Sequence, residues 1–240
     1  MERPYYASPV CRWGTEAIRQ LRGAVYRGDG SVVEMVRGRL TDDVLQMAGD
    51  GLLDAVAQDV DGALELATHC AAALRDRSWV GDDELADQIE VALRRGATPL
   101  LRPIAVDLEE LASFLEGDPR YGEARIDLKS GEIWPPHDDL EEDDGVDDVE
   151  GPWRYIPHQG SHDGYRDMER FIATVTDPEI ADRLEIAITG TGAFHRFKDV
   201  LSRWPEELGR YLMLRDERQR GRARAWLAAE GYRPAGAAHL

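Results

Sequence analysis

Apolar residues recur at helical spacing along the first part of the chain, from about residue 15 to residue 95. Ile18, Leu21 and Val25 are three and four residues apart, which places them on one face of an α-helix. Gly-Asp pairs interrupt the pattern several times. We therefore expect several helices in this segment rather than one long helix.

A proline-bearing connector at residues 97–103 follows a helix that Gly96 is expected to end. The connector predicts a boundary between a helical N-terminal region, residues 1–103, and a second domain, residues 104–240.

The period of the pattern changes after residue 103. A short helix capped by Asp107 comes first, and then Ala124, Ile126 and Leu128 alternate with charged residues, which is typical of a strand. The turn at residues 129–131 predicts a β-hairpin. Residues 153–157 are expected to add a third strand, because an isolated hairpin is rarely stable.

Helical spacing returns after residue 160. Ser161 is the expected cap of one helix, and the start signal Thr176-Asp177-Pro178-Glu179 opens a second. A third helix follows Gly192, and a long last helix covers about 206–230. The predicted fold class is α+β and predominantly helical. A small antiparallel sheet packs with C-terminal helices and is preceded by an all-helical region.

Charge is distributed very unevenly. The formal net charge is −18, and residues 104–152 hold 17 acids against 3 bases, a net −14. Nine of those acids lie in residues 137–150, which we expect to form a solvated acidic loop. This balance argues against non-specific attraction to nucleic acid or to anionic membranes.

Cysteine usage and hydropathy give further expectations. Cys11 and Cys70 form no CxxC or Cys/His pattern, so no metal site and no cofactor is predicted. The acidic loop does not fit an EF-hand either, because aligning Gly145 with the EF-hand glycine puts Gly151 where a Glu is required. No uncharged apolar run approaches the ~20 residues of a membrane span, and we expect a cytoplasmic protein.

The stretch around Gly190, Gly192, Arg196 and Lys198 is the candidate anion-binding site. Glycines before a helix allow backbone N–H groups to converge on an anion, and two basic residues follow. The alternative is that Gly190 ends one helix, Gly192 relaxes the turn, and the neighbouring phenylalanines fill the core.

Arg215, Arg218 and Arg222 recur at i, i+3 and i+7 on the last helix and form a candidate partner-facing stripe. Such a stripe can bind acidic groups of a protein or the phosphates of a nucleic acid. The chain's own acidic segment could also neutralise it.

Four residues near 160 carry groups that occur in catalytic and metal sites: His158, Ser161, His162 and Asp163. Catalytic triads usually combine distant parts of a chain, and Ser161 has a simpler expected role as a helix cap. We therefore predict no catalytic residue here.

Three motifs in register, at residues 122–135, 164–172 and 192–201, resemble the bacterial uncharacterised protein family 0158. The resemblance covers about residues 106–234. It implies a bacterial origin and no established activity, cofactor or catalytic residue.

Together these patterns favour a non-catalytic intracellular binding or regulatory module that contacts an unidentified protein partner. One alternative is an enzyme or sensor for a phosphorylated or anionic small molecule at residues 190–198. A second is a nucleic-acid-associated regulator that uses the Arg-rich last helix.

Overall fold

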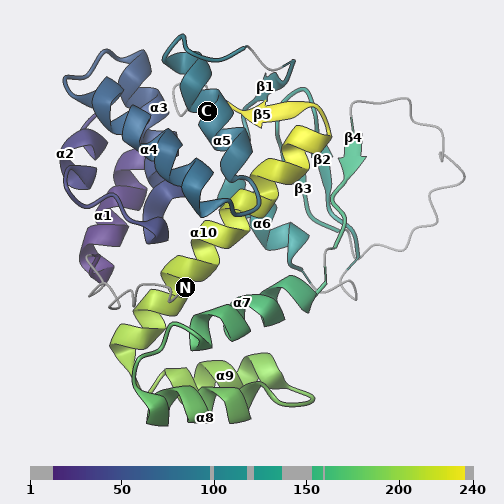
Figure 1. Cartoon of the computed structure of the whole chain (residues 1–240). Helices are drawn as coiled ribbons and strands as arrows, with labels where there is room; N and C mark the ends of the chain where they lie inside the picture. Colours follow the sequence, from purple (N-terminus) through teal and green to yellow (C-terminus); the bar gives the residue numbers. More distant parts are fainter. Residues whose placement is uncertain (1–12, 98–99, 118–121, 137–152, 159, 236–240) are drawn as a thin grey trace, which may run out of the picture.

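The structure, a computed structural model, describes residues 13–97, 100–117, 122–136, 153–158 and 160–235 (Figure 1). The expected acidic loop at 137–150 lies outside the described residues. Within residues 13–97 the N-terminal region contains helices and no strand, as predicted. Its elements are α1 (Thr15–Tyr26), α2 (Val32–Val36), the 3-10 helix η1 (Asp42–Val44), α3 (Leu45–Ala57), α4 (Ala63–Arg77) and α5 (Asp82–Ala92).

These helices share one apolar core. Leu45 and Leu52 of α3, Leu74 of α4 and Leu85 of α5 are fully buried in it. The helical spacing seen in the sequence therefore turns one face of each helix toward a common centre, which is the arrangement that removes most apolar surface from water.

The rest of the chain combines short strands with helices. Its elements are β1 (Arg102–Ile104), α6 (Leu108–Leu115), β2 (Arg125–Asp127), β3 (Ile133–Trp134), β4 (Trp153–Tyr155), α7 (His162–Ile172), α8 (Pro178–Ile188), α9 (Ala193–Leu201), α10 (Pro205–Ala229) and β5 (Tyr232–Pro234). The predicted fold class is confirmed: the protein is mostly helical with a small antiparallel sheet.

The predicted hairpin and third strand form a sheet with the order β3-β2-β4, and both pairings are antiparallel. Ile126 and Ile133 are neighbours across the sheet and point inward. They share a core with Leu111 of α6 and Leu227 of α10. Alternation along the strands thus buries one face of the sheet and leaves the other exposed.

A second sheet was not predicted. β1 pairs in parallel with β5, with Arg102 opposite Tyr232 and Ile104 opposite Pro234. The connector expected at 97–103 therefore includes the start of a strand, and the partner of that strand lies at the far end of the chain. Each strand holds one proline, which lacks the N–H that a central strand needs, so neither segment reads as a strand in the sequence.

Two of the three expected helix starts are capped by a side chain. Asp107 accepts hydrogen bonds from the backbone N–H groups of Glu109 and Glu110, and Asp177 does the same for α8. The prediction that the Ser161 side chain caps α7 is wrong. Ser161 occupies the N-cap position of α7, but its backbone is already helical and its side chain makes no capping hydrogen bond.

The long helix α10 runs diagonally through the molecule, with N-terminal helices along one side and α6 and the strands along the other (Figure 1). Its backbone comes very close to the turn before α5. A Cβ on Gly221 would lie 2.2 Å from the carbonyl oxygen of Val80, and one on Gly81 would lie 2.1 Å from that of Gly221. Gly81 also has a φ of 86°, so the two glycines are required for this contact.

Candidate functional site

The arginines expected to face a partner contact carboxylates of the same chain. Arg218 and Arg222 both pair with Asp167 of α7, which is fully buried, and Arg222 Nη1 lies 2.9 Å from its Oδ2. Arg222 also pairs with Glu116, and Arg215 pairs with the neighbouring Asp216 at 2.8 Å. Of these three carboxylates only Glu116 belongs to the acidic segment 104–152, so the stripe is neutralised within the chain mainly by acids outside the segment that was expected to do so. A partner-facing role for the stripe stays a prediction.

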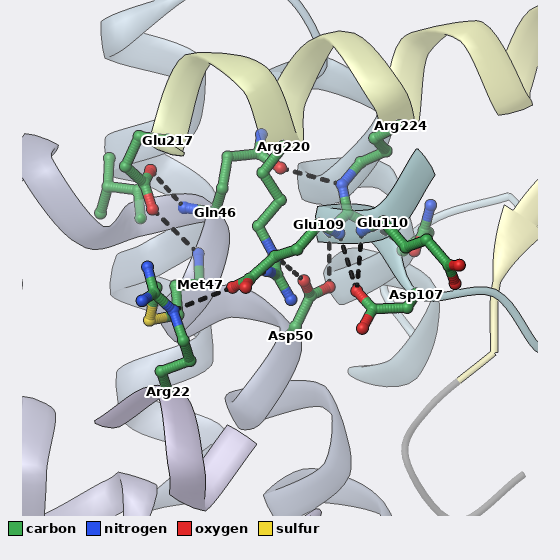
Figure 2. Close-up of polar contacts among 12 residues, drawn as sticks. Arg22, Gln46, Met47, Asp50, Asp107, Glu109, Glu110, Glu217, Arg220 and Arg224 are labelled. Carbon is green, nitrogen blue, oxygen red and sulfur yellow. Dashed lines mark hydrogen bonds and ion pairs between the residues drawn. The ribbon is translucent and has the colours of Figure 1, made fainter. Parts of the chain in front are cut away.

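Two other arginines of α10, Arg220 and Arg224, contact the N-terminal helix α3. Arg224 Nη2 lies 2.6 Å from Asp50 Oδ1, and Arg220 Nε lies 2.8 Å from Asp50 Oδ2 (Figure 2). Burial alone would raise the pKa of Asp50, but the two guanidinium groups outweigh it and hold the pKa below its usual range. Asp50 is therefore an ionised carboxylate clamped between two arginines.

Glu217 of α10 caps a helix that is distant in the sequence. Its carboxylate accepts the backbone N–H groups of Gln46 at 2.7 Å and Met47 at 3.0 Å, both in the first turn of α3 (Figure 2). It also pairs with Arg77 at 3.0 Å, and Arg77 pairs with Asp82 at 2.6 Å. Burial raises the pKa of Glu217, although Arg77 and the two N–H groups act in the opposite direction. Val44, at the N-cap position of α3, has no side-chain oxygen, and Glu217 supplies the missing acceptor.

The Arg-rich segment of α10 is thus an electrostatic connection between the N-terminal helices and the rest of the protein. The Glu217–Arg77 pair is buried, and the pairs of Asp50 with Arg220 and Arg224 are largely buried. Because a buried ion pair is favourable only in good geometry, these pairs restrict the relative position of the helices they join.

The predicted anion site has a different local structure from a phosphate cradle. Gly190 and Gly192 have left-handed φ values of 79° and 78°. Arg196 donates to the carbonyl oxygens of Ala187 at 3.1 Å and Thr189 at 2.7 Å, at the end of α8. Its guanidinium therefore caps the C-terminus of that helix. Lys198 lies in the last turn of α9. Anion binding at these residues stays a prediction.

The four candidate residues near 160 lie at the start of α7 or just before it. His158 Nε2 lies 2.7 Å from the carbonyl oxygen of Gly122, and His162 and Asp163 lie in the first turn of α7. In the described part of the chain, no group of three His, Cys, Asp or Glu side chains is placed to hold a metal ion.

Among the helices of the described ranges, none is long and apolar enough to cross a membrane.

The outer face of the three-stranded sheet presents aromatic side chains. Arg125 of β2 lies opposite Trp134 of β3 and Tyr155 of β4, so these three share the exposed face. Trp153 packs edge-to-face on Trp134 at 5.8 Å, and the Arg125 guanidinium lies 5.5 Å from the Trp153 ring centre. Trp134 remains 38% exposed and Tyr155 67% exposed. We call Arg125, Trp134, Trp153 and Tyr155 the aromatic face.

A cleft of about 1060 Å³ opens between the N-terminal helices and the β1–β5 pair. Its walls come from α1, α3 and α5 on one side, and from residues 101–109, Arg220 and residues 233–235 on the other. Gln88 of α5 and Arg233 of β5 are among the polar residues that line it.

Sequence reasoning identified neither surface. For the aromatic face a signal existed: Ile126 and Ile133 point inward, so the alternation turns Arg125 and Trp134 outward. For the cleft there was none, because its walls come from segments that are far apart in the sequence.

The comparisons with known proteins support only the family. Neither curated proteins nor solved structures match the chain. The family match begins at residue 127, within β2, rather than near residue 106 as the motifs suggested. Residues 127–240 match the model of the Uncharacterised protein family (UPF0158), which confirms the family resemblance over this part of the chain.

Proposed function

We propose that this protein is a non-catalytic binding module and that it contacts a protein partner through the aromatic face. The observation that carries the proposal is a cluster on one face of a small sheet, in which Trp134, Tyr155 and Arg125 are exposed and Trp153 is half-buried between them. Trp, Tyr and Arg are the residue types that contribute most binding energy at protein interfaces.

The sheet provides a rigid base for these side chains. Ile126 and Ile133 anchor its inner face in the core, so the outer residues are held in place before a partner arrives. Such preorganisation reduces the entropy that binding would otherwise cost.

Charge indicates which partner chemistry fits. Residues 137–150, with nine acids, join β3 to β4, and residues 104–152 carry a net charge of −14. Arginine and lysine side chains stack favourably on Trp and Tyr rings, as Arg125 already does on Trp153. We therefore propose that the partner presents a basic segment rich in Arg or Lys.

The test uses a fluorescent nona-arginine peptide as the probe, with a nona-glutamate peptide as the negative control. The protein should bind the basic peptide, and binding should weaken as salt rises. Replacing Trp134 and Tyr155 together by Ala should weaken it by roughly 5- to 30-fold, because each lost cation–π contact removes about 0.5–1 kcal/mol.

The matched control is Ile186→Ala on α8, because Ile186 is 74% exposed and lies on another part of the surface. This variant should bind like the parent protein. Equal binding by the double variant and the parent would mean that net charge alone attracts the peptide, and would exclude the aromatic face. Affinity capture with the same three proteins then identifies natural partners, which should be missing from the double variant alone.

A further inference from the structure

The cleft between α1, α3, α5 and the β1–β5 pair has the size and lining of a small-molecule site. Its volume of about 1060 Å³ is sufficient for a ligand of ordinary metabolite or drug size. Leu53, Val91 and Val106 are among the apolar side chains of its walls. Sites of this kind often lie where two parts of a protein meet.

Gln88 supplies a hydrogen-bond donor that the described residues leave unused. The side chain is only 7% exposed and lines the cleft, and its Nε2 atom is buried with no hydrogen-bond partner. Its Oε1 accepts from Arg224 Nη1 at 3.3 Å, which sets the orientation of the amide. An unsatisfied buried donor is costly, so an acceptor that reaches it from the cleft is favoured.

The charged side chains that line the cleft indicate whether the acceptor is neutral or negatively charged. All four acids of the lining already have interactions: Asp50 and Glu109 with Arg220, Asp107 with backbone N–H groups, and Asp54 with another group of the chain. Arg233, by contrast, makes no ion pair with any described residue and lines the same cleft. The unused groups are therefore donors, and one of them is cationic.

From these observations we infer that the cleft binds an apolar molecule that carries a carboxylate group. The apolar walls accept the body of the ligand, and Gln88 and Arg233 are the donors available to its carboxylate. This inference does not depend on the aromatic face.

The experiment measures binding of decanoate by isothermal titration calorimetry, with decanol as the uncharged probe of the same chain length. The full chain should bind decanoate at least tenfold more tightly than decanol, because a donor bonds an ionised acceptor more strongly than a neutral one. Decanoate should also raise the melting temperature.

Gln88→Glu is the informative variant. It keeps an oxygen for Arg224 but removes the amide donor and adds a negative charge, so decanoate affinity should fall by at least about tenfold. Arg233→Met should lower decanoate affinity while leaving decanol binding unchanged. Val91→Trp should block both probes by filling the cleft.

Ile186→Trp on α8 is the matched control for added bulk and should bind decanoate like the parent protein. Decanoate binding that persists unchanged in Val91→Trp or Gln88→Glu would overturn the inference, as would no binding at all to the parent. Equal affinity for decanol and decanoate would show that the carboxylate contributes nothing to binding and would overturn that part of the inference.

Discussion

The two halves of α10 belong to one uninterrupted helix but differ in what they bury. The first half lies in an apolar cluster, where the Tyr211 ring meets Phe171 at 5.4 Å and Phe197 at 4.8 Å in edge-to-face geometry. The second half buries Leu227 beside the sheet but also buries Glu217 and Arg224, whose charges meet the N-terminal helices.

The two kinds of contact restrict the position of the helix to different degrees. Apolar contacts are largely non-directional and tolerate small shifts, whereas a buried ion pair is favourable only when both charges meet in good geometry. We therefore expect the apolar half of α10 to contribute stability that conservative changes reduce only slightly. The charged half should fix the position of the N-terminal helices and tolerate change poorly.

The largest effect is expected from Glu217→Ala. The change removes the acceptor of two backbone N–H groups and leaves Arg77, whose side chain is 2% exposed, with one carboxylate partner instead of two. Breaking a buried pair from one side typically costs about 3–5 kcal/mol in the free energy of unfolding, which urea titration measures. Glu217→Gln, which keeps an oxygen acceptor, should lose less. A loss under about 1 kcal/mol in Glu217→Ala would mean that the charged half does not position the N-terminal helices.

A similar but smaller loss, roughly 3 kcal/mol, is expected from Gly221→Ala. The added methyl group would collide with the Val80 carbonyl and force α10 away from the turn before α5. Gly209→Ala, on the same helix, is the control, because no other atom lies within 4 Å of a Cβ placed there. That variant should be as stable as the parent or up to about 1 kcal/mol more stable. If both variants unfold at the same urea concentration, the close approach is not needed.

Phe197→Leu tests the apolar half. Leu keeps most of the buried volume beside Phe171 and Tyr211, so the free energy of unfolding should fall by less than about 1.5 kcal/mol. The loss should also be the same at low and at high salt, because no charge is involved. A loss equal to that of Glu217→Ala would remove the contrast between the two halves.

The smallest expected effect is a pH dependence of the free energy of unfolding that comes from Asp50. Because the pKa of Asp50 is lowered in the folded protein, its contribution is fully present above the unfolded-state value of about 4. It is lost as pH falls below that value through the folded pKa. Glu217 acts with the opposite sign, because burial raises its pKa. The stability gap between the parent and Asp50→Asn should therefore narrow between about pH 5 and pH 3. A gap that stays constant would mean that Asp50 does not titrate there.

Local patterns were enough to predict most elements of the fold. Helical spacing identified the N-terminal helices, alternation identified the hairpin, and Asp107 and Asp177 identified two helix starts. Each of these signals lies within a few residues, where backbone geometry and side-chain period act directly.

The candidate sites could not be predicted in the same way. A stripe such as Arg215, Arg218 and Arg222 has the same spacing whether it faces solvent, a partner or buried carboxylates. Arg224 and Asp50 are 174 residues apart, and nothing local to either of them identifies the other.

The amino-acid sequence alone was sufficient for the helices, the small antiparallel sheet, the charge imbalance and the family resemblance of residues 127–240. The three-dimensional structure was needed to show that the arginines of α10 turn inward and that β1 pairs with β5. It was also needed to show the cleft between the β1–β5 pair and the N-terminal helices. Secondary structure follows from local periodicity, whereas ion pairs, parallel strands and clefts depend on which distant segments the folded chain brings together.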